Sequence, residues 1–457
     1  MCIGGIGLAG ALTLTPSAGT VAGSITLQGL AVGFLTVEVS YNDMLFGRAT
    51  PAADGAFAIT FSTLSLPDGP DTLAVAAYNA AAGQPYTLTA AAAWSVTVGN
   101  SAINIVSYGA VADGTTDNIT AITNAIAAAA TAGVSVYVPA GTFAFGNIIS
   151  LTGTKMFGVG VASVLYALDY NNEAIFLYGS GSQVRQLTLT GATAPARLSP
   201  WQATHITAFG ASNFVIDHVN IVGSAAAGIQ LANVQVTNGA GSSNGMITNN
   251  TLTGTFADSI HMTAWASFIH VEGNTIVGSG DDGIAVVSYD YDSGVTHDIT
   301  AINNVITGNV NGRSMSVVGG ENVLYQNNYL ANDTLAAGVY IAQESSYNTY
   351  GCTNVTVEFN TIVNCGNYTI GHAPVMIITT GSGSNTDINL ISNQIVITTN
   401  NYYGVRVYGN NTPPIVLNYN QIIGTPSPYD IEDTGVTLNP YVSGAVGYVA
   451  APVLPIP

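Results

Sequence analysis

The most restrictive feature of this sequence is a repeat between Asn250 and Glu344. Four similar segments follow one another there: NTLTGTFADSIHMTAW, NTIVGSGDDGIAVVSY, NVITGNVNGRSMSVVGG and NYLANDTLAAGVYIAQE. Each contains an apolar strand after the Asn, a turn of small residues and a second strand. Repeats of about 20–45 residues stack so that each contacts only its neighbours, and this pattern therefore predicts a solenoid of β-strands.

One column of this alignment carries charged side chains. When the segments are aligned on their second strand, Asp258, Asp282, Arg313 and Ala337 share a position. Neighbouring strands lie about 4.8 Å apart, so successive members of a column are close in a solenoid. We therefore expect two carboxylates and a guanidinium to face solvent together.

Asparagines begin successive coils, and we interpret them as structural. They stand at positions 220, 250, 274, 304, 328, 360, 393 and 420. Asn tolerates the left-handed conformation of a turn and forms hydrogen-bonded ladders between stacked strands. The irregular spacing indicates that insertions enlarge individual coils, and such insertions collect on one face of a repeat protein.

The length and charge of the chain restrict its class. A chain of 457 residues is too long for one ordinary core, which predicts two domains or one elongated array. It has 6 Lys and Arg against 25 Asp and Glu, a net charge of −19. Nucleic acid and anionic membranes need clustered cations, so neither is an expected partner. Because only 7% of the residues are charged, we expect a secreted or cell-surface protein kept soluble by Asn, Thr and Ser.

No segment is predicted to enter a membrane, and Cys2, Cys352 and Cys365 do not form a disulfide framework. The opening MCIGGIGLAGALTL lacks a basic start and is too short to span a bilayer. Cys352 and Cys365 flank one strand segment, where they either bridge neighbouring coils or remain buried thiols. The scattered histidines show no metal-ligand spacing, so no metal site is predicted.

Residues 1–98 are expected to form a separate domain. The runs SITLQGL, FLTVEVSY, FAITFSTL, DTLAVAAY and AWSVTV are separated by turn signals such as ADGA. Short strands at this spacing predict a small antiparallel β-sandwich, similar to immunoglobulin-like modules. We expect a spacer or docking role for it, with carbohydrate binding as the alternative.

A different pattern follows the linker VGNSAIN. The stretch INIVSYGAVADGTTDNITAITNAIAAAATAGVSVYVPAGTF predicts one amphipathic helix and then a strand. Thr116 and Asp117 are candidate caps. The apolar face of the helix comprises Ile119, Ile122, Ala125, Ile126 and Ala129.

This stretch resembles the entry sequence of right-handed parallel β-helix proteins of the pectate lyase and polygalacturonase superfamily, in which YGA, DGxTDxT, a helix and VYVPAGTY follow in this order. The resemblance implies an all-β fold: a right-handed parallel β-helix over residues 103–425. In that superfamily the helix caps the N-terminal end of the solenoid, where an open coil exposes unpaired backbone groups. Residues 426–457 are rich in Pro and Gly, and we expect an irregular C-terminal tail.

Two motifs, ADSIHM and GSGDDGIAV, resemble the NTD and DD motifs of glycoside hydrolase family 28, the polygalacturonase family. The resemblance implies that Asp258, Asp281 and Asp282 catalyse inverting hydrolysis, although Phe256 and Ala257 replace the Asn and Thr of NTD. An inverting pair needs one protonated and one ionised carboxyl, about 6.5–9.5 Å apart. Neighbouring carboxylates raise one another's pKa, which supplies an acid from the same residue type. We assign Asp282 as the general acid and the other two as the residues that activate water, although spacing in the sequence does not by itself fix this division.

The chain departs from that family at its basic residues. NGRS replaces GHG, which puts Arg313 where a His is expected, and GVYIAQ replaces RIK. In the family these basic residues hold galacturonate carboxylates, so a neutral polysaccharide is the expected substrate. The expected substrate-binding residues are His261, Trp265, Tyr289, Arg313, Tyr340 and Glu344. The alternatives are a salt bridge for Arg313 and shielding of a coil edge for Trp265 and Tyr289.

Two other functions fit the same residues. In β-helix polysaccharide lyases an Arg removes a proton beside a uronate carboxyl while acidic side chains hold calcium. Arg313 and the three Asp residues would take these roles in a lyase or epimerase. A hydrolase needs no cofactor, and calcium is expected only of a lyase. The second alternative is a non-catalytic β-helix, such as a virion spike or surface fibre, that binds glycan without cutting it.

Overall fold

The computed structural model describes eleven stretches of the chain. These are residues 11–16, 19–41, 44–63, 66, 69–79, 88–98, 102–233, 241–381, 383–398, 403–433 and 435–439. Contacts divide the chain into two compact units, Met1–Ile103 with Ala128–Tyr137 and Asn104–Ala127 with Val138–Pro457. Within the described stretches, every helix is too short or too polar to cross a bilayer.

The N-terminal residues form two small β-sheets around one core. One sheet is antiparallel and contains β1 (Ala11–Leu14), β3 (Ser24–Val32) and β6 (Ala56–Ser62). The other has the order β2 (Thr20–Val21), β8 (Leu88–Val98), β7 (Gly69–Tyr78), β4 (Thr36–Tyr41) and β5 (Met44–Ala49). Leu27 of the first sheet and Val37, Leu73 and Trp94 of the second share the core. The two sheets around one core confirm the predicted sandwich, but not its purely antiparallel pairing, because β2 pairs with β8 in parallel. Inward-facing residues alternate with exposed ones, as in β3.

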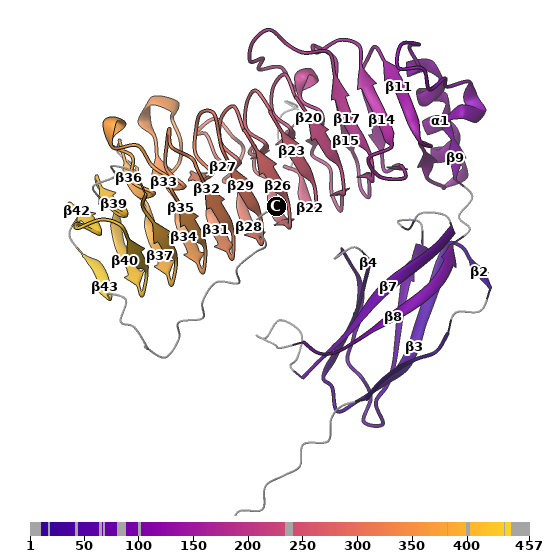
Figure 1. Cartoon of the computed structure of the whole chain (residues 1–457), viewed down its shortest axis with the longest axis horizontal. Helices are drawn as coiled ribbons and strands as arrows, with labels where there is room; N and C mark the ends of the chain where they lie inside the picture. The colour runs from indigo at the N-terminus through magenta and orange to yellow at the C-terminus, as the bar shows by residue number, and fades with distance from the viewer. Residues whose placement is uncertain are drawn as a thin grey trace, which may run out of the picture. The chain divides into compact units, whose positions relative to one another are not determined.

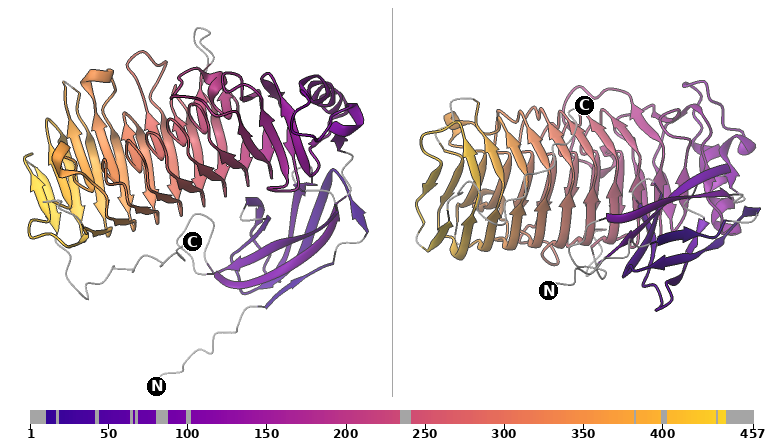
Figure 2. Two further views of the ribbon diagram at one scale, coloured as in Figure 1. Left: turned by 45° about the horizontal axis from the view of Figure 1, so that its top comes forward. Right: turned by 60° about the horizontal axis from the view of Figure 1, so that its bottom comes forward.

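The described residues from Ile103 to Asn439 form a parallel β-solenoid, whose coils stack side by side in Figures 1 and 2. Each complete coil adds one strand to each of three sheets, and all strand pairs in these sheets are parallel (for example β24 with β27). We name the sheets by their first strands: the β9 sheet, the β11 sheet and the β12 sheet.

The β9 sheet contains β9 (Ile103–Asn104), β10 (Val136–Tyr137), β13 (Lys155–Phe157), β16 (Gln183–Arg185), β19 (Val215–Asp217), β22 (Ser243–Thr248), β25 (Ser267–Glu272), β28 (His297–Ile302), β31 (Glu321–Gln326), β34 (Thr353–Glu358), β37 (Thr386–Ile391), β40 (Thr412–Asn418) and β43 (Val436–Asn439). The β11 sheet contains β11 (Gly141–Phe145), β14 (Ser163–Ala167), β17 (Thr188–Gly191), β20 (Asn220–Val222), β23 (Thr251–Thr253), β26 (Thr275–Val277), β29 (Val305–Thr307), β32 (Tyr329–Ala331), β35 (Thr361–Val363), β38 (Gln394–Val396) and β41 (Gln421–Ile423). The β12 sheet contains β12 (Ile149–Thr152), β15 (Ile175–Tyr178), β18 (Ile206–Phe209), β21 (Ile229–Ala232), β24 (Ile260–Met262), β27 (Ile284–Val287), β30 (Met315–Val318), β33 (Val339–Gln343), β36 (Val375–Thr379), β39 (Val405–Tyr408) and β42 (Tyr429–Ile431). Short 3-10 helices lie at Ile105–Tyr108, Trp201–Ala203, Ser345–Tyr347 and Tyr368–Ile370.

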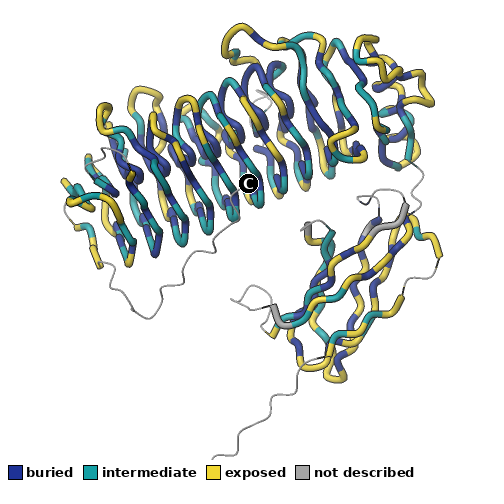
Figure 3. Tube along the Cα trace, in the orientation of Figure 1, coloured by how far each residue is buried: buried dark blue, intermediate teal, exposed yellow. Residues whose placement is uncertain are grey.

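Stacked apolar columns form the solenoid core. In the β12 sheet, Ile260, Ile284, Met315 and Val339 occupy one column and none is exposed. Strands of the β9 sheet such as β25 and β31 alternate buried with half-buried positions, whereas β27 and β30 of the β12 sheet are buried throughout; Figure 3 shows the burial of the coils. The apolar residues that repeat in every segment of the sequence therefore become one continuous interior.

Helix α1 (Ile119–Ala132) lies at the N-terminal end of the coils, beside β11 (Figure 1). Of its predicted apolar face, Ile122, Ala125 and Ala129 are fully buried. The Asp117 carboxylate accepts from the Ile119 N–H at 3.0 Å, as expected of a cap. Thr116 is not a cap, because its hydroxyl donates to Asp113 instead.

The asparagine ladder is confirmed from Asn250 to Asn420. In each step an amide Nδ2 donates to the Oδ1 of the next Asn at 2.9–3.0 Å, through positions 250, 274, 304, 328, 360, 393 and 420. Asn220 does not belong to it, because β20 pairs Asn220 with Thr251, one position beyond the ladder. The left-handed conformation falls on the preceding residue, for example Asn303 with φ 57°, so the ladder Asn itself supplies hydrogen bonds and not the turn.

The structure also resolves the expectations for the cysteines and the tail. Cys352 and Cys365 are buried thiols that form no disulfide, so they do not bridge each other, whereas Cys2 lies outside the described residues. The segment from 426 was expected to be irregular, but within it β42 pairs with β39 and β43 with β40. These two strands extend the solenoid by parallel pairing with the preceding coil. The Pro and Gly content of the segment makes them hard to recognise in the sequence.

Candidate active site

The charged column predicted from the repeat lies at the beginning of four strands of the β12 sheet. Ile260 pairs with Ile284, Ile284 with Met315, and Met315 with Val339. Asp258, Asp282, Arg313 and Ala337 each precede these residues by two positions, which confirms their alignment. They lie where the chain enters the β12 sheet.

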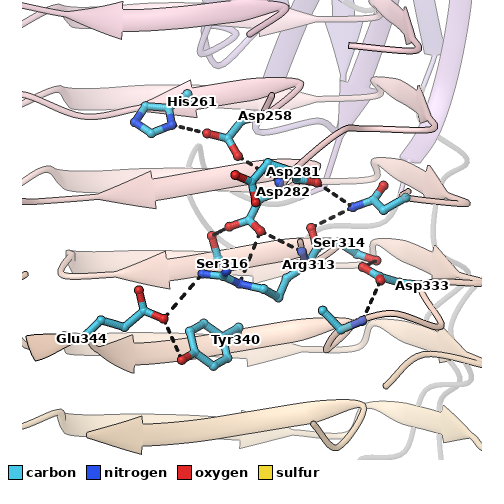
Figure 4. Close-up of polar contacts among 12 residues, drawn as sticks. Asp258, His261, Asp281, Asp282, Arg313, Ser314, Ser316, Asp333, Tyr340 and Glu344 are labelled. Atoms are coloured by element: carbon cyan, nitrogen blue, oxygen red, sulfur yellow. Dashed lines mark hydrogen bonds and ion pairs between the residues drawn. The ribbon is translucent and has the colours of Figure 1, made fainter. Parts of the chain in front are cut away.

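Three carboxyls converge at this point (Figure 4). One oxygen from each of Asp258, Asp281 and Asp282 lies within 4.8 Å of the other two. Side-chain exposure falls from 26% at Asp281 to 10% at Asp258 and 6% at Asp282. The closest oxygens are nearer to one another than the about 6.5–9.5 Å expected of an inverting pair, so the predicted separation is not found between them.

Asp258 is held as a carboxylate. Its Oδ1 accepts from the Asp282 N–H at 2.9 Å, and its Oδ2 forms a hydrogen bond with Nδ1 of His261. Burial raises the pKa of Asp258, but the charge and hydrogen bond of His261, the Asp282 N–H and the charge of Arg197 together bring it below its ordinary value. Burial in turn lowers the pKa of His261, and the Asp258 carboxylate more than offsets this and raises it.

The pKa of Asp282 is shifted in the opposite direction to that of Asp258. Its Oδ1 accepts from the Arg313 N–H at 2.7 Å, and the Ser316 hydroxyl lies 2.5 Å from its Oδ2. Burial raises its pKa to about 6; Arg313 opposes the rise, while the charges of Asp258 and Asp281 add to it. Two neighbouring carboxyls thus have pKa values shifted in opposite directions, as an acid and a base require.

Arg197 is a site residue that the sequence did not reveal. It lies in the long loop between β17 and β18, and its Nη1 is 2.5 Å from Asp281 Oδ2. The two residues are 84 positions apart, and no repeat aligns them. The only sequence signal was an Arg in a chain with 6 basic residues.

Arg313 lies between two acids and an aromatic ring. Its guanidinium stands 4.4 Å from the ring centre of Tyr340, 3.3 Å from Asp282 Oδ1 and 3.9 Å from Glu344 Oε1. The Tyr340 hydroxyl donates to Glu344 Oε1 at 2.9 Å. Burial lowers the pKa of Arg313, but the charges of Asp282 and Glu344 raise it further above its ordinary value, so the guanidinium stays charged. The salt bridge proposed for Arg313 is therefore present.

A pocket of about 500 Å³ contains this cluster. Ala285, Val287 and Val318 give it an apolar floor on the outer face of the β12 sheet. Of the predicted substrate-binding residues, His261, Tyr289, Arg313 and Glu344 line the pocket. Tyr340 lies beneath Arg313 and is buried.

Trp265 is the predicted binding residue that the structure places elsewhere. It aligns with Tyr289 in the repeat, but it is absent from the residues that line the pocket. Its backbone has a φ of 63°, and its indole lies against Gly294. The left-handed turn ends the strand early, which directs the ring toward the loop after Tyr289.

The acidic cluster also meets the geometric requirement for a metal site, since three carboxylate oxygens are mutually close. Asp281 is already paired with Arg197, and Asp282 accepts from Arg313 and Ser316. A calcium ion would have to share these oxygens with a cation and with fixed donors. The donor set is chemically suitable, but the existing partners satisfy it without a metal.

Comparisons with known proteins agree with this fold. A sequence profile described as rhamnogalacturonase A/epimerase, pectate lyase-like, matches residues 102–340. No curated protein sequence matches the chain. The fold and the acidic pocket define a pectate lyase-like right-handed β-helix protein. Because the profile spans more than half of its residues, the chain belongs to the rhamnogalacturonase A/epimerase family.

Solved structures show where else this fold is used. The catalytic domain of a GH87 α-1,3-glucanase, in complex with tetrasaccharides, has a TM-score of 0.60 at 17% identity, covering 96% of this chain and 92% of that one. The A-module of a mannuronan C-5 epimerase from Azotobacter vinelandii has a TM-score of 0.55 at 18% identity, and the match covers 74% of this chain and 99% of that one. A surface protein and adhesin of Streptococcus pneumoniae has a TM-score of 0.55 at 14% identity, and the match covers 75% of this chain and 100% of that one. At these identities the likeness establishes the fold alone.

Proposed function

We propose that the chain is a glycoside hydrolase that cleaves a neutral polysaccharide with an acid and a base drawn from Asp258, Asp281 and Asp282. The observation that carries the proposal is the pair of opposite pKa shifts at adjacent carboxyls, down at Asp258 and up to about 6 at Asp282. Glycoside hydrolysis needs one carboxyl of each kind. An α-1,3-glucanase shares this fold, and the family is named for a rhamnogalacturonase, so glycan cleavage is one chemistry that the fold supports.

The reaction assigns one step to each side of this pair. Asp282 gives its proton to the glycosidic oxygen as the bond from that oxygen to the anomeric carbon breaks. A water molecule forms the new bond to the anomeric carbon, and its proton passes to Asp258 or Asp281. Because one oxygen of each carboxyl lies within 4.8 Å of the other two, the separation does not support an assignment of stereochemistry, and we propose acid/base hydrolysis without assigning the configuration of the product.

The charge of the pocket favours a neutral substrate. Arg197 and Arg313 face four carboxyls, those of Asp258, Asp281, Asp282 and Glu344, and both guanidiniums are paired with them. To reach either guanidinium, a uronate carboxylate would have to displace a carboxylate of the protein that is already paired with it. We therefore propose that the substrate is a neutral glycan. We also propose that the protein acts outside the cell on a polymeric form of this glycan.

A lyase or epimerase acting on a uronate polymer is the second candidate, because the three carboxylates could hold calcium and the epimerase A-module shares the fold. It requires Arg313 to act as a base in its neutral form. The ion pairs with Asp282 and Glu344 raise the pKa of Arg313, so they oppose that role. The adhesin likewise shares the fold, but opposed pKa shifts have no use in a surface that only binds glycan.

Digestion of a polysaccharide panel tests the proposal. We expect the protein to release reducing sugar from at least one neutral glucan, galactan or mannan, and to do so equally well in excess chelator. Polygalacturonate and polymannuronate should release less. Activity confined to uronate polymers and abolished by chelation would establish the second candidate instead.

The pH dependence of the reaction should follow the two carboxyls. Catalysis needs Asp282 protonated, so kcat/KM should fall as pH rises through about 6. It needs Asp258 ionised, and the lowered pKa of Asp258 keeps it so well into the acid range. We expect the highest kcat/KM below pH 6, measured from pH 3 to 9 in buffers of constant ionic strength. A profile that climbs above pH 6 would exclude Asp282 as the acid.

Removing the charge of Arg197 should shift this profile at its acid end. Its positive charge lowers the pKa of Asp258, so in Arg197→Gln that pKa rises and the acid limb moves to higher pH. The pair is exposed, and the loss in kcat/KM at the optimum should be only roughly threefold. Arg48→Gln, which removes the exposed partner of Glu38 in the sandwich, is the matched control. If the acid limb of Arg197→Gln coincides with that of the parent protein, the charge of Arg197 does not affect the pKa of the catalytic base.

A further inference from the structure

Exposed tyrosines gather on the loops beside the pocket. Tyr291, in the loop after β27, is 73% exposed, and Tyr347, in the loop after β33, is 63% exposed. Ile370, after β35, is 58% exposed. Large apolar surfaces left in water at neighbouring positions usually mark a binding surface.

These loops are fixed to one another. The Tyr289 and Tyr291 rings are stacked, with centres 5.0 Å apart and planes 4° from parallel. The Asp290 N–H donates to the Asn348 carbonyl at 2.8 Å, and the Tyr350 N–H donates to the Ser288 carbonyl at 3.1 Å. These contacts hold the loops in one conformation. The protein would therefore lose little conformational entropy when a ligand binds to the rings.

The exposed rings are continuous with the candidate active site. Tyr289, Tyr347 and Ile370 line the same pocket as Asp258 and Asp282. Tyr289 also packs on the apolar cluster of the pocket floor, which holds its ring in place, and Tyr291 extends the stack into solvent. The surface therefore leads away from the carboxyls along the flank of the β12 sheet.

We propose that the exposed rings of Tyr291 and Tyr347, with Tyr289 supporting Tyr291 in the stack, form a surface that we call the tyrosine platform, and that this platform binds the pyranose rings of a neutral polysaccharide next to the bond being cleaved. Pyranose rings present apolar C–H faces that stack on aromatic rings, and the tyrosine hydroxyls remain free for sugar hydroxyls. Asp290 and Asp292 in the same loop add negative charge, which disfavours an anionic chain. This inference deepens the proposed function and rests on it for the identity of the ligand.

Binding is best measured in an Asp282→Asn background, where no hydrolysis consumes the ligand. The probes are soluble dextran, β-glucan, galactomannan and polygalacturonate in affinity gels, and insoluble α-1,3-glucan in pull-downs. We expect retention by at least one neutral polymer, and an affinity lowered about tenfold or more when Tyr291→Ala and Tyr347→Ala are combined. Tyr291→Phe with Tyr347→Phe should stay within about threefold, because stacking needs only the rings.

Tyr419→Ala is the matched control, since Tyr419 is an exposed tyrosine (42%) in the turn between β40 and β41. It should bind as the background protein does. The inference is overturned if no neutral polymer is retained, or if the double alanine variant binds as well as the control. Failure of the proposed function is a separate result: the parent protein would then release no sugar from a polymer that the platform still binds.

Discussion

Asp282→Asn should lower kcat on the best neutral polysaccharide by roughly 100- to 10,000-fold, the range expected when a general acid is lost. The amide has the shape of the carboxyl but no proton of suitable acidity to donate. Its oxygen can still accept from the Arg313 N–H, and its nitrogen can face the Ser316 hydroxyl, so the local hydrogen bonds are kept. KM should change much less than kcat, because the sugar-binding surfaces are untouched.

Asp298→Asn is the control for this result. Asp298 is a partly exposed carboxyl of the β9 sheet that pairs with His297 at 2.7 Å and takes no part in the pocket. Its substitution should leave kcat within about twofold, as expected for a surface site. An Asp282→Asn protein with near-parental kcat would remove Asp282 from the mechanism, provided that its circular dichroism spectrum and melting temperature match the parent.

Asn304→Ala should lower the free energy of unfolding by roughly 3–6 kcal/mol, because it leaves several buried polar groups without partners. Asn304 Oδ1 accepts from the Asn274 N–H and Nδ2, both at 2.9 Å. Its Nδ2 donates to the Val271 carbonyl at 3.1 Å and to Asn328 Oδ1 at 3.0 Å. The site is fully buried, so water does not replace these bonds.

Urea denaturation followed by circular dichroism measures the loss, with Asn354→Ala as the control. Asn354 is an exposed Asn on the β9 sheet whose Nδ2 donates to Asn322 at 2.8 Å. Its removal should cost only about 1–2 kcal/mol, because water satisfies the groups left behind and the loss comes from placing Ala at a left-handed φ of 52°. Equal midpoints for the two variants would show that the ladder does not stabilise the solenoid as described.

The sequence was sufficient to predict the coils because their information is local and repeated. In a strand that buries one face, every second residue points into the core and is apolar. The four aligned segments repeat that pattern. The alignment brought Asp258, Asp282 and Arg313 to adjacent coils without any knowledge of the loops. Burial of the apolar face fixes the register in which neighbouring strands pair. The same register places Asp258, Asp282 and Arg313 in one column.

The remaining features depend on contacts outside the repeat. Arg197 reaches Asp281 from an insertion between β17 and β18, and the length of such a loop does not determine where its tip lies. Trp265 aligned with Tyr289, but a left-handed turn moved its ring away from the pocket. Asn220 shared the spacing of the ladder and was one position out of register. These differences arise from turns and insertions, where backbone conformation is set by neighbours distant in sequence.

Mass spectrometry of the products formed in H₂¹⁸O, with excess chelator present, tests the central claim most directly. Hydrolysis by a carboxyl acid and base adds one water per bond cleaved, so every new reducing end from a neutral polysaccharide should carry one ¹⁸O and no unsaturation. Products lighter by one water, or a polymer whose sugar configuration changes without any loss of chain length, would contradict hydrolysis and assign the carboxyl cluster to elimination or epimerisation.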